Sequence, residues 1–126
     1  MEVLRWPAPR EVVRQDVETI AGIYRNLGAP VAEQLVLRAF GQLALTVAAI
    51  AERVRAQDLR DLAGQLQGLR RLAAEVGLVS LAQVAADARS CLERADGTAF
   101  AAVWARLMRV AEQSLSGDPG MVDLSG

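Results

Sequence analysis

The chain has 126 residues, of which 52% are hydrophobic, so it is long enough for one domain with one continuous core. Its 14 basic residues are offset by 15 acidic ones, and the net charge of −1 gives no electrostatic reason to expect a nucleic-acid or anionic-membrane partner. The absence of histidine and the single cysteine, Cys91, exclude an internal disulfide and a Cys/His metal site.

The first predicted element is an N-terminal helix that follows Pro7 and Pro9. Alanine, the best helix former, occurs 23 times, and no segment alternates with a period of two, so we expect helices and no sheet. Gly28 suits the end of this helix and Pro30 suits the first turn of the next one. The apolar stripe of the first helix consists of Val13, Val17, Ile20, Tyr24 and Leu27.

The second helix carries the strongest periodic signal in the chain. Its longest uncharged run, from Ala39 to Ala51, is too short to span a bilayer, and the first residues lack the apolar segment of a signal peptide. We therefore expect a soluble, cytoplasmic protein. The stripe consists of Val36, Phe40, Leu43, Val47, Ile50 and Val54, whereas Leu35, Leu37 and Leu45 lie outside it.

Two shorter helices are predicted next. Asp58 is the expected N-cap of the third helix and Gly77 its expected end, while Ser80 and Gln83 have the spacing of a capping box for the fourth. The third stripe is Leu59, Leu62, Leu66, Leu69, Ala73 and Val76. The fourth is Leu81, Val84, Ala85, Ala88, Cys91 and Leu92, which makes Cys91 a buried structural thiol rather than a nucleophile.

A fifth helix follows the break at Asp96-Gly97-Thr98 and ends near Leu115. Its stripe consists of Phe100, Val103, Trp104, Leu107, Val110 and Ala111. Because the connections are short, we predict an all-α protein: an antiparallel up-down-up-down four-helix bundle with an additional N-terminal helix across one end or side. The predicted divisions are an N-terminal extension and helix (1–29), the bundle (30–115) and a flexible tail (116–126).

The exposed side of the third helix is the candidate binding surface. At about 100° per residue, Gln67 lies well away from the apolar stripe and is expected to face solvent, together with Gly64, Gly68 and Arg71, with Arg70 at the flank. Two small residues allow close approach, and two guanidiniums suit a carboxylate or phosphate group. The alternative interpretation is an ordinary solvated helix face.

The segment from Gln67 to Leu78 resembles the phosphoacceptor region of the histidine phosphotransfer (Hpt) family. That family has an exposed histidine, a lysine three residues later, a glycine four residues later and a glycine ten residues later that ends the helix. Gln67, Arg70, Arg71 and Gly77 hold these places here. The turn and helix from Leu78 to Ala85 and the break from Leu92 to Gly97 are also similar, and the resemblance covers about Val31 to Leu115.

The resemblance implies an Hpt-like bundle of a phosphorelay, with Gln67 in the place of the phosphoacceptor. It also implies a docking surface for a response-regulator receiver domain or a histidine kinase, formed by Gly64, Gly68, Arg70, Arg71 and Ala74. A glutamine amide is not nucleophilic and cannot hold a labile phosphoramidate, so transfer is not expected. Arg70 keeps a positive charge near the site, whereas Arg71 places a long side chain where the family has glycine.

Three functions follow from the sequence. The first is a pseudo-phosphotransfer module that binds a receiver or kinase without accepting phosphate. The second is a structural or assembly protein that forms homodimers through the surplus apolar surface of the first two helices. An enzyme is the least favoured, because no nucleophile, base and orienting group coincide, and we expect no catalytic residue, metal or cofactor.

Overall fold

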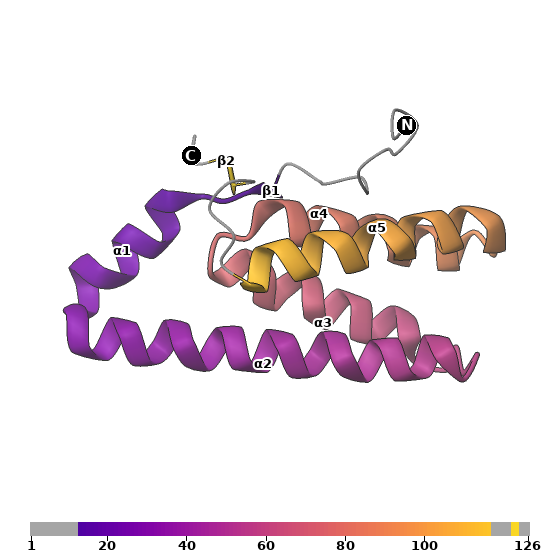
Figure 1. The fold of residues 1–126 in the computed structure, drawn as a ribbon, viewed down its shortest axis with the longest axis horizontal. Helices are drawn as coiled ribbons and strands as arrows, with labels where there is room; N and C mark the ends of the chain where they lie inside the picture. Colours follow the sequence, from indigo (N-terminus) through magenta and orange to yellow (C-terminus); the bar gives the residue numbers. More distant parts are fainter. Residues whose placement is uncertain (1–12, 117–121, 124–126) are drawn as a thin grey trace, which may run out of the picture.

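The computed structural model describes residues 13–116 and 122–123. Over these residues the protein is all-helical, as predicted, apart from one pair of two-residue strands (Figure 1). The helices are α1 (Val17–Leu27), α2 (Ala29–Arg55), α3 (Leu62–Glu75), α4 (Val79–Glu93) and α5 (Gly97–Ser116). In the segment predicted as a flexible tail (116–126), Ser116 is the last residue of α5 and Val122–Asp123 form a strand. The other residues of that segment lie outside the described residues.

The two strands are a feature that the sequence did not predict. β1 (Val13–Arg14) pairs in parallel with β2 (Val122–Asp123), and β1 packs against α4 and α5. Val13 is fully buried there, in a strand that ends before α1 begins at Val17, so its assignment to the first helix was wrong. Two residues are too few for a period-two pattern, and burial against the distant helices fixes the extended conformation instead.

The first helix begins at Val17 because Asp16 caps it. The Asp16 carboxylate accepts hydrogen bonds from the Glu18 amide at 3.1 Å and from the Thr19 hydroxyl at 2.9 Å. No residue of α1 is buried, and both Val17 and Leu27 are exposed, so the predicted apolar stripe is only partly covered. In Figure 1, α1 extends from the end of the other helices and turns back on the first part of α2.

The core is formed by the four longer helices, and the predicted stripes supply nearly all of it. Successive helices run in opposite directions, with α3 and α5 both packed on α4 (Figure 1). In the four stripes predicted for the bundle, the buried residues are Leu43, Val47, Ile50, Leu62, Leu66, Leu69, Ala73, Val76, Leu81, Val84, Ala85, Ala88, Cys91, Leu107, Val110 and Ala111. Helix α2 packs mainly on α3 and has little contact with α5, which leaves one edge of the helix group open.

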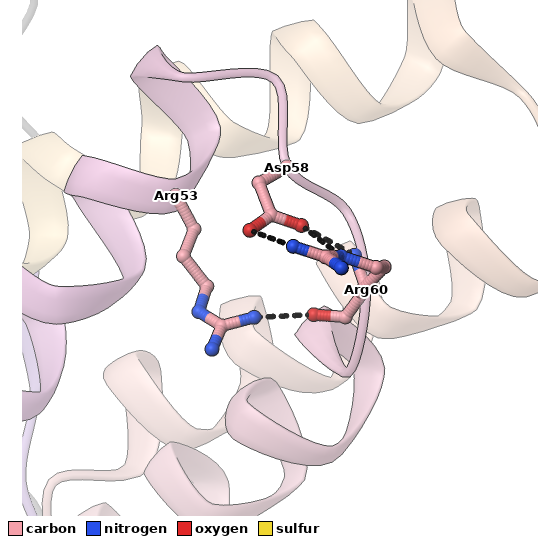
Figure 2. Close-up of polar contacts among 3 residues, drawn as sticks. All are labelled: Arg53, Asp58 and Arg60. Carbon is pink, nitrogen blue, oxygen red and sulfur yellow. Dashed lines mark hydrogen bonds and ion pairs between the residues drawn. The ribbon is translucent and has the colours of Figure 1, made fainter.

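Asp58 does not cap α3, contrary to the sequence prediction. The helix begins four residues later, after Asp61 in a left-handed conformation, and Leu59 is exposed. Asp58 instead pairs with Arg60, whose backbone carbonyl accepts a hydrogen bond from Arg53 at 2.6 Å (Figure 2). The side-chain hydrogen bonds from Arg60 lower the pKa of the Asp58 carboxyl below its usual value. The α2–α3 connection is therefore held by Arg53 of α2, and no side chain caps the start of α3.

The capping box predicted at Ser80 and Gln83 is also absent. Helix α4 begins one residue before Ser80, and no side chain caps it. The Ser80 hydroxyl accepts a hydrogen bond from the Arg14 amide at 2.7 Å, while Gln83 donates to Asp87 at 3.2 Å. Ser80 therefore holds the N-terminal strand against α4.

Candidate functional site

The helical hairpin of α3 and α4 positions the candidate site. Gly77 ends α3 with a φ of +76°, a conformation that glycine adopts without a Cβ penalty, and the chain reverses at Leu78. In an antiparallel hairpin, residues equally far from the turn lie opposite one another. Gln67 on α3 therefore faces Arg89 on α4, since each is eleven residues from Leu78.

Two arginines converge on the side-chain oxygen of Gln67. Its Oε1 accepts a hydrogen bond from Nη1 of Arg89 at 2.6 Å and another from Nε of Arg70 at 3.2 Å. Arg89 also contacts the Glu93 carboxylate, at 3.2 Å. Two cations thus surround one neutral oxygen, and a single carboxylate partly offsets their charge. This arrangement is suited to holding a more strongly negative oxygen in the same place.

The sequence prediction that Gln67 faces solvent holds only in part. Gln67 is half-buried, and the Arg89 side chain reaches across from α4 to its side-chain oxygen. Among the other predicted docking residues, Gly64, Arg71 and Ala74 are exposed, whereas Gly68 and Arg70 are half-buried. They share one side of α3, but Arg71 has no hydrogen-bond or ion-pair partner among the described residues and does not join the cluster around Gln67.

A shallow hollow of about 290 Å³ adjoins this cluster on the side of the hairpin turn. Arg70 and Ala74 of α3 line one wall and small residues of α4, among them Ala82 and Ala86, line the other. Ala82 lies opposite Ala74 and Ala86 opposite Arg70, because the two members of each pair are equally far from Leu78 in the chain. The surface therefore combines a small, largely apolar depression with the cationic Arg70 at the border shared with the cluster and the acidic Asp16 at the opposite end.

Sequence reasoning missed three residues that contribute to this site, one on α4 and two at the start of α1. Arg89 was not identified because helix periodicity places it on α4 but does not say which helix it faces; reflection of Gln67 through the Gly77–Leu78 turn would have found it. Asp16 and Thr19, which line the end of the hollow, come from the start of α1. Their position depends on the hydrogen bond from the Asp16 amide to the Gly77 carbonyl at 2.6 Å, a contact that sequence alone does not reveal.

Cys91 is buried, as predicted, and lies 3.5 Å from an Arg94 nitrogen. Across the described part of the chain, no group of three or more histidine, cysteine, aspartate or glutamate residues could hold a metal ion. Comparisons with protein-family models, with curated proteins and with solved structures found no match to this chain.

Proposed function

We propose that the protein is an Hpt-like pseudo-phosphotransfer module of two-component signalling. It would use an Hpt-like four-helix bundle to bind a response-regulator receiver domain or a histidine kinase without accepting phosphate. The observation that carries this proposal is the convergence of Arg70 and Arg89 on Oε1 of Gln67. In the Hpt resemblance this is the place of the phosphoacceptor, and the surrounding positive charge is retained while the nucleophile is lost.

The same geometry favours an acidic partner. A receiver domain presents its phosphoacceptor aspartate to an Hpt protein, and a carboxylate placed at the cluster would replace the neutral amide oxygen as acceptor of two guanidinium hydrogen bonds. The hollow lined by Ala74, Ala82 and Ala86 would take an apolar side chain of the partner. Binding without transfer would make the protein an adaptor or a competitor of active phosphotransfer proteins.

The proposal predicts that Arg70→Glu or Arg89→Glu weakens binding to a receiver or kinase at least about tenfold, because reversal of charge replaces attraction by repulsion. Isothermal titration of purified receiver domains and kinases from the source organism would measure this. Arg55→Glu is the matched control: it changes the net charge equally, on the C-terminal end of α2, and Arg55 is exposed. If no receiver or kinase binds the unchanged protein, or if all three variants bind equally, this function is wrong.

A second candidate function, assembly through homodimerisation, is favoured by one observation on α2. The leucines predicted to lie outside its core stripe are indeed exposed: Leu37 at 72%, Leu45 at 68% and Leu35 at 42%. Removing such surface from water is favourable by about 25 cal/mol per Å². This surface lies on α2, whereas the arginine cluster lies on α3 and α4, so the two functions are compatible.

A further inference from the structure

The solvent side of α2 carries a short apolar row beside exposed polar residues such as Gln34, Arg38 and Gln42. Leu37, Gly41 and Leu45 are four residues apart, so they lie along one side of the helix, and all three are exposed. A Cβ added to Gly41 would meet no atom within 4 Å, so the surface above this glycine is open. We call these three residues the Leu37–Leu45 row.

The Leu37–Leu45 row is symmetric about its glycine, and this symmetry points to its occupant. We propose that the row pairs with the same row of a second copy of the chain, with the two α2 helices antiparallel and a two-fold axis at Gly41. This proposal deepens the assembly function proposed above. In a two-fold interface the same patch must contact itself. An axis at Gly41 places Leu37 of each copy beside Leu45 of the other and lets the two backbones approach closely.

The open edge between α2 and α5 provides space beside this row. A groove of about 340 Å³ lies there, lined by Ala44, Val47 and Ala48 of α2 and by Met108 and Ala111 of α5. Exposed Ala44 and Ala48 lie next to the Leu37–Leu45 row on the helix surface, at the following turns. Leu37 and Leu45 of a second copy that extend past the edge of the row would enter this groove, as the side-chain ridges of one helix pack into the grooves of another.

The length of α2 sets the size of the proposed interface. Its 27 residues span about 40 Å, and Gly41 lies next to the middle of the helix, so a two-fold axis there overlaps almost the whole of α2. A strip about 10 Å wide would bury about 400 Å² on each copy, and the α5 groove adds to it. This is about half of the roughly 800 Å² per partner of a standard interface and lies in the range of weak, transient complexes, so we expect a dimer that forms only at high micromolar concentrations.

A lipid bilayer is the competing occupant of this surface. Helix α2 is long and apolar enough, by length and composition alone, to cross a membrane, which the uncharged run of 13 residues from Ala39 to Ala51 did not suggest. However, the opposite side of α2 places Leu43, Val47 and Ile50 in the core. Insertion would withdraw these residues from α3 and uncover the other helices, whereas pairing with a second copy leaves the fold unchanged. The structure therefore favours the dimer.

Sedimentation equilibrium of the full chain between 1 and 200 µM tests the proposal. We expect a monomer–dimer equilibrium whose Kd rises at least about tenfold in Leu37→Glu/Leu45→Glu, with an unchanged circular dichroism spectrum because both side chains are exposed. Leu59→Glu, which changes an exposed leucine outside α2, should dimerise like the unchanged protein. A Gly41→Cys variant should form a disulfide dimer on mild oxidation. Ala49→Cys should not, since its two copies would lie about 24 Å apart along the helices.

The outcomes distinguish a failure of the interface at the Leu37–Leu45 row from a failure of the assembly function. A protein that stays monomeric at 200 µM overturns both the assembly function and this interface. A dimer that tolerates Leu37→Glu/Leu45→Glu and does not form the Gly41→Cys disulfide overturns the interface alone and leaves assembly through another surface. Flotation of the full chain with phosphatidylcholine–phosphatidylglycerol vesicles tests the competing occupant, a lipid bilayer. If the protein is monomeric in solution and its binding to vesicles requires Leu37 and Leu45, the row binds lipid and the proposal is overturned.

Discussion

Replacing Gly77 by alanine should lower the free energy of unfolding by about 3 kcal/mol, a large part of the stability of a domain of this size. Two effects add. The φ of +76° is unfavourable for a residue with a Cβ, and that Cβ would lie 2.5 Å from the Asp16 carbonyl oxygen, which is backbone and cannot move independently. The chain must therefore separate the start of α1 from the α3–α4 turn.

Chemical denaturation measures the loss, and hydrogen exchange locates it. The Asp16 amide, which donates to the Gly77 carbonyl, should exchange faster in Gly77→Ala, while amides in the middle of α4 should change only with global stability. Gly64→Ala is the matched control: it lies inside α3 with open space around its Cβ, so it should be neutral or stabilise by about 0.5–1 kcal/mol. A Gly77→Ala protein as stable as the original would show that the contact with Asp16 is wrong.

Replacing Leu69 by alanine should cost about 2–5 kcal/mol, the range seen when a fully buried leucine is truncated and the cavity does not collapse. Leu69 has no exposed surface and lies on the core side of α3, two residues beyond Gln67 in the chain. Urea denaturation at low micromolar concentration would measure the change.

Leu37→Ala is the matched comparison, because it removes the same atoms from a side chain that is 72% exposed and should alter stability by no more than about 0.5 kcal/mol. If the two variants lost stability equally, α3 would not be oriented as described, and Gln67 would not lie at the surface of the hairpin. The comparison thus tests the rotation of α3 on which the candidate site depends.

The helices and their core residues could be predicted because the apolar periodicity that places a residue in the core is a local property of the sequence. Leu66 and Leu69 of α3 and Val84 of α4 recur at helical spacing and are all buried, so periodicity was sufficient. Gly77 was likewise predictable, since a left-handed residue at a helix end is a local property.

Features that depend on contacts between distant segments could not be predicted. Asp58 has the chemistry of an N-cap, but Arg60 competes for its carboxylate; Ser80 was available as a cap, but the Arg14 amide uses its hydroxyl. At the candidate site, Arg70 could be predicted as a neighbour of Gln67 on the same helix. Arg89 was missed because periodicity alone does not specify which residues of two packed helices meet; it could be found only by combining periodicity with the predicted turn at Gly77 and counting equal distances on either side of it.

Phosphoryl transfer to a Gln67→His variant tests the central claim most directly, that this position is the place of a phosphoacceptor beside Arg70 and Arg89. The chain contains no other histidine, so any acid-labile, base-stable phosphate on the protein must be on the introduced residue. Gln42→His, at an exposed position on α2, is the control for a histidine outside the site. With a phosphorylated receiver as donor, we predict labelling of Gln67→His, weaker labelling when Arg89→Ala is added, and none of Gln42→His. Equal labelling of the two histidine variants, or none of either by any receiver that binds the protein, would contradict the account.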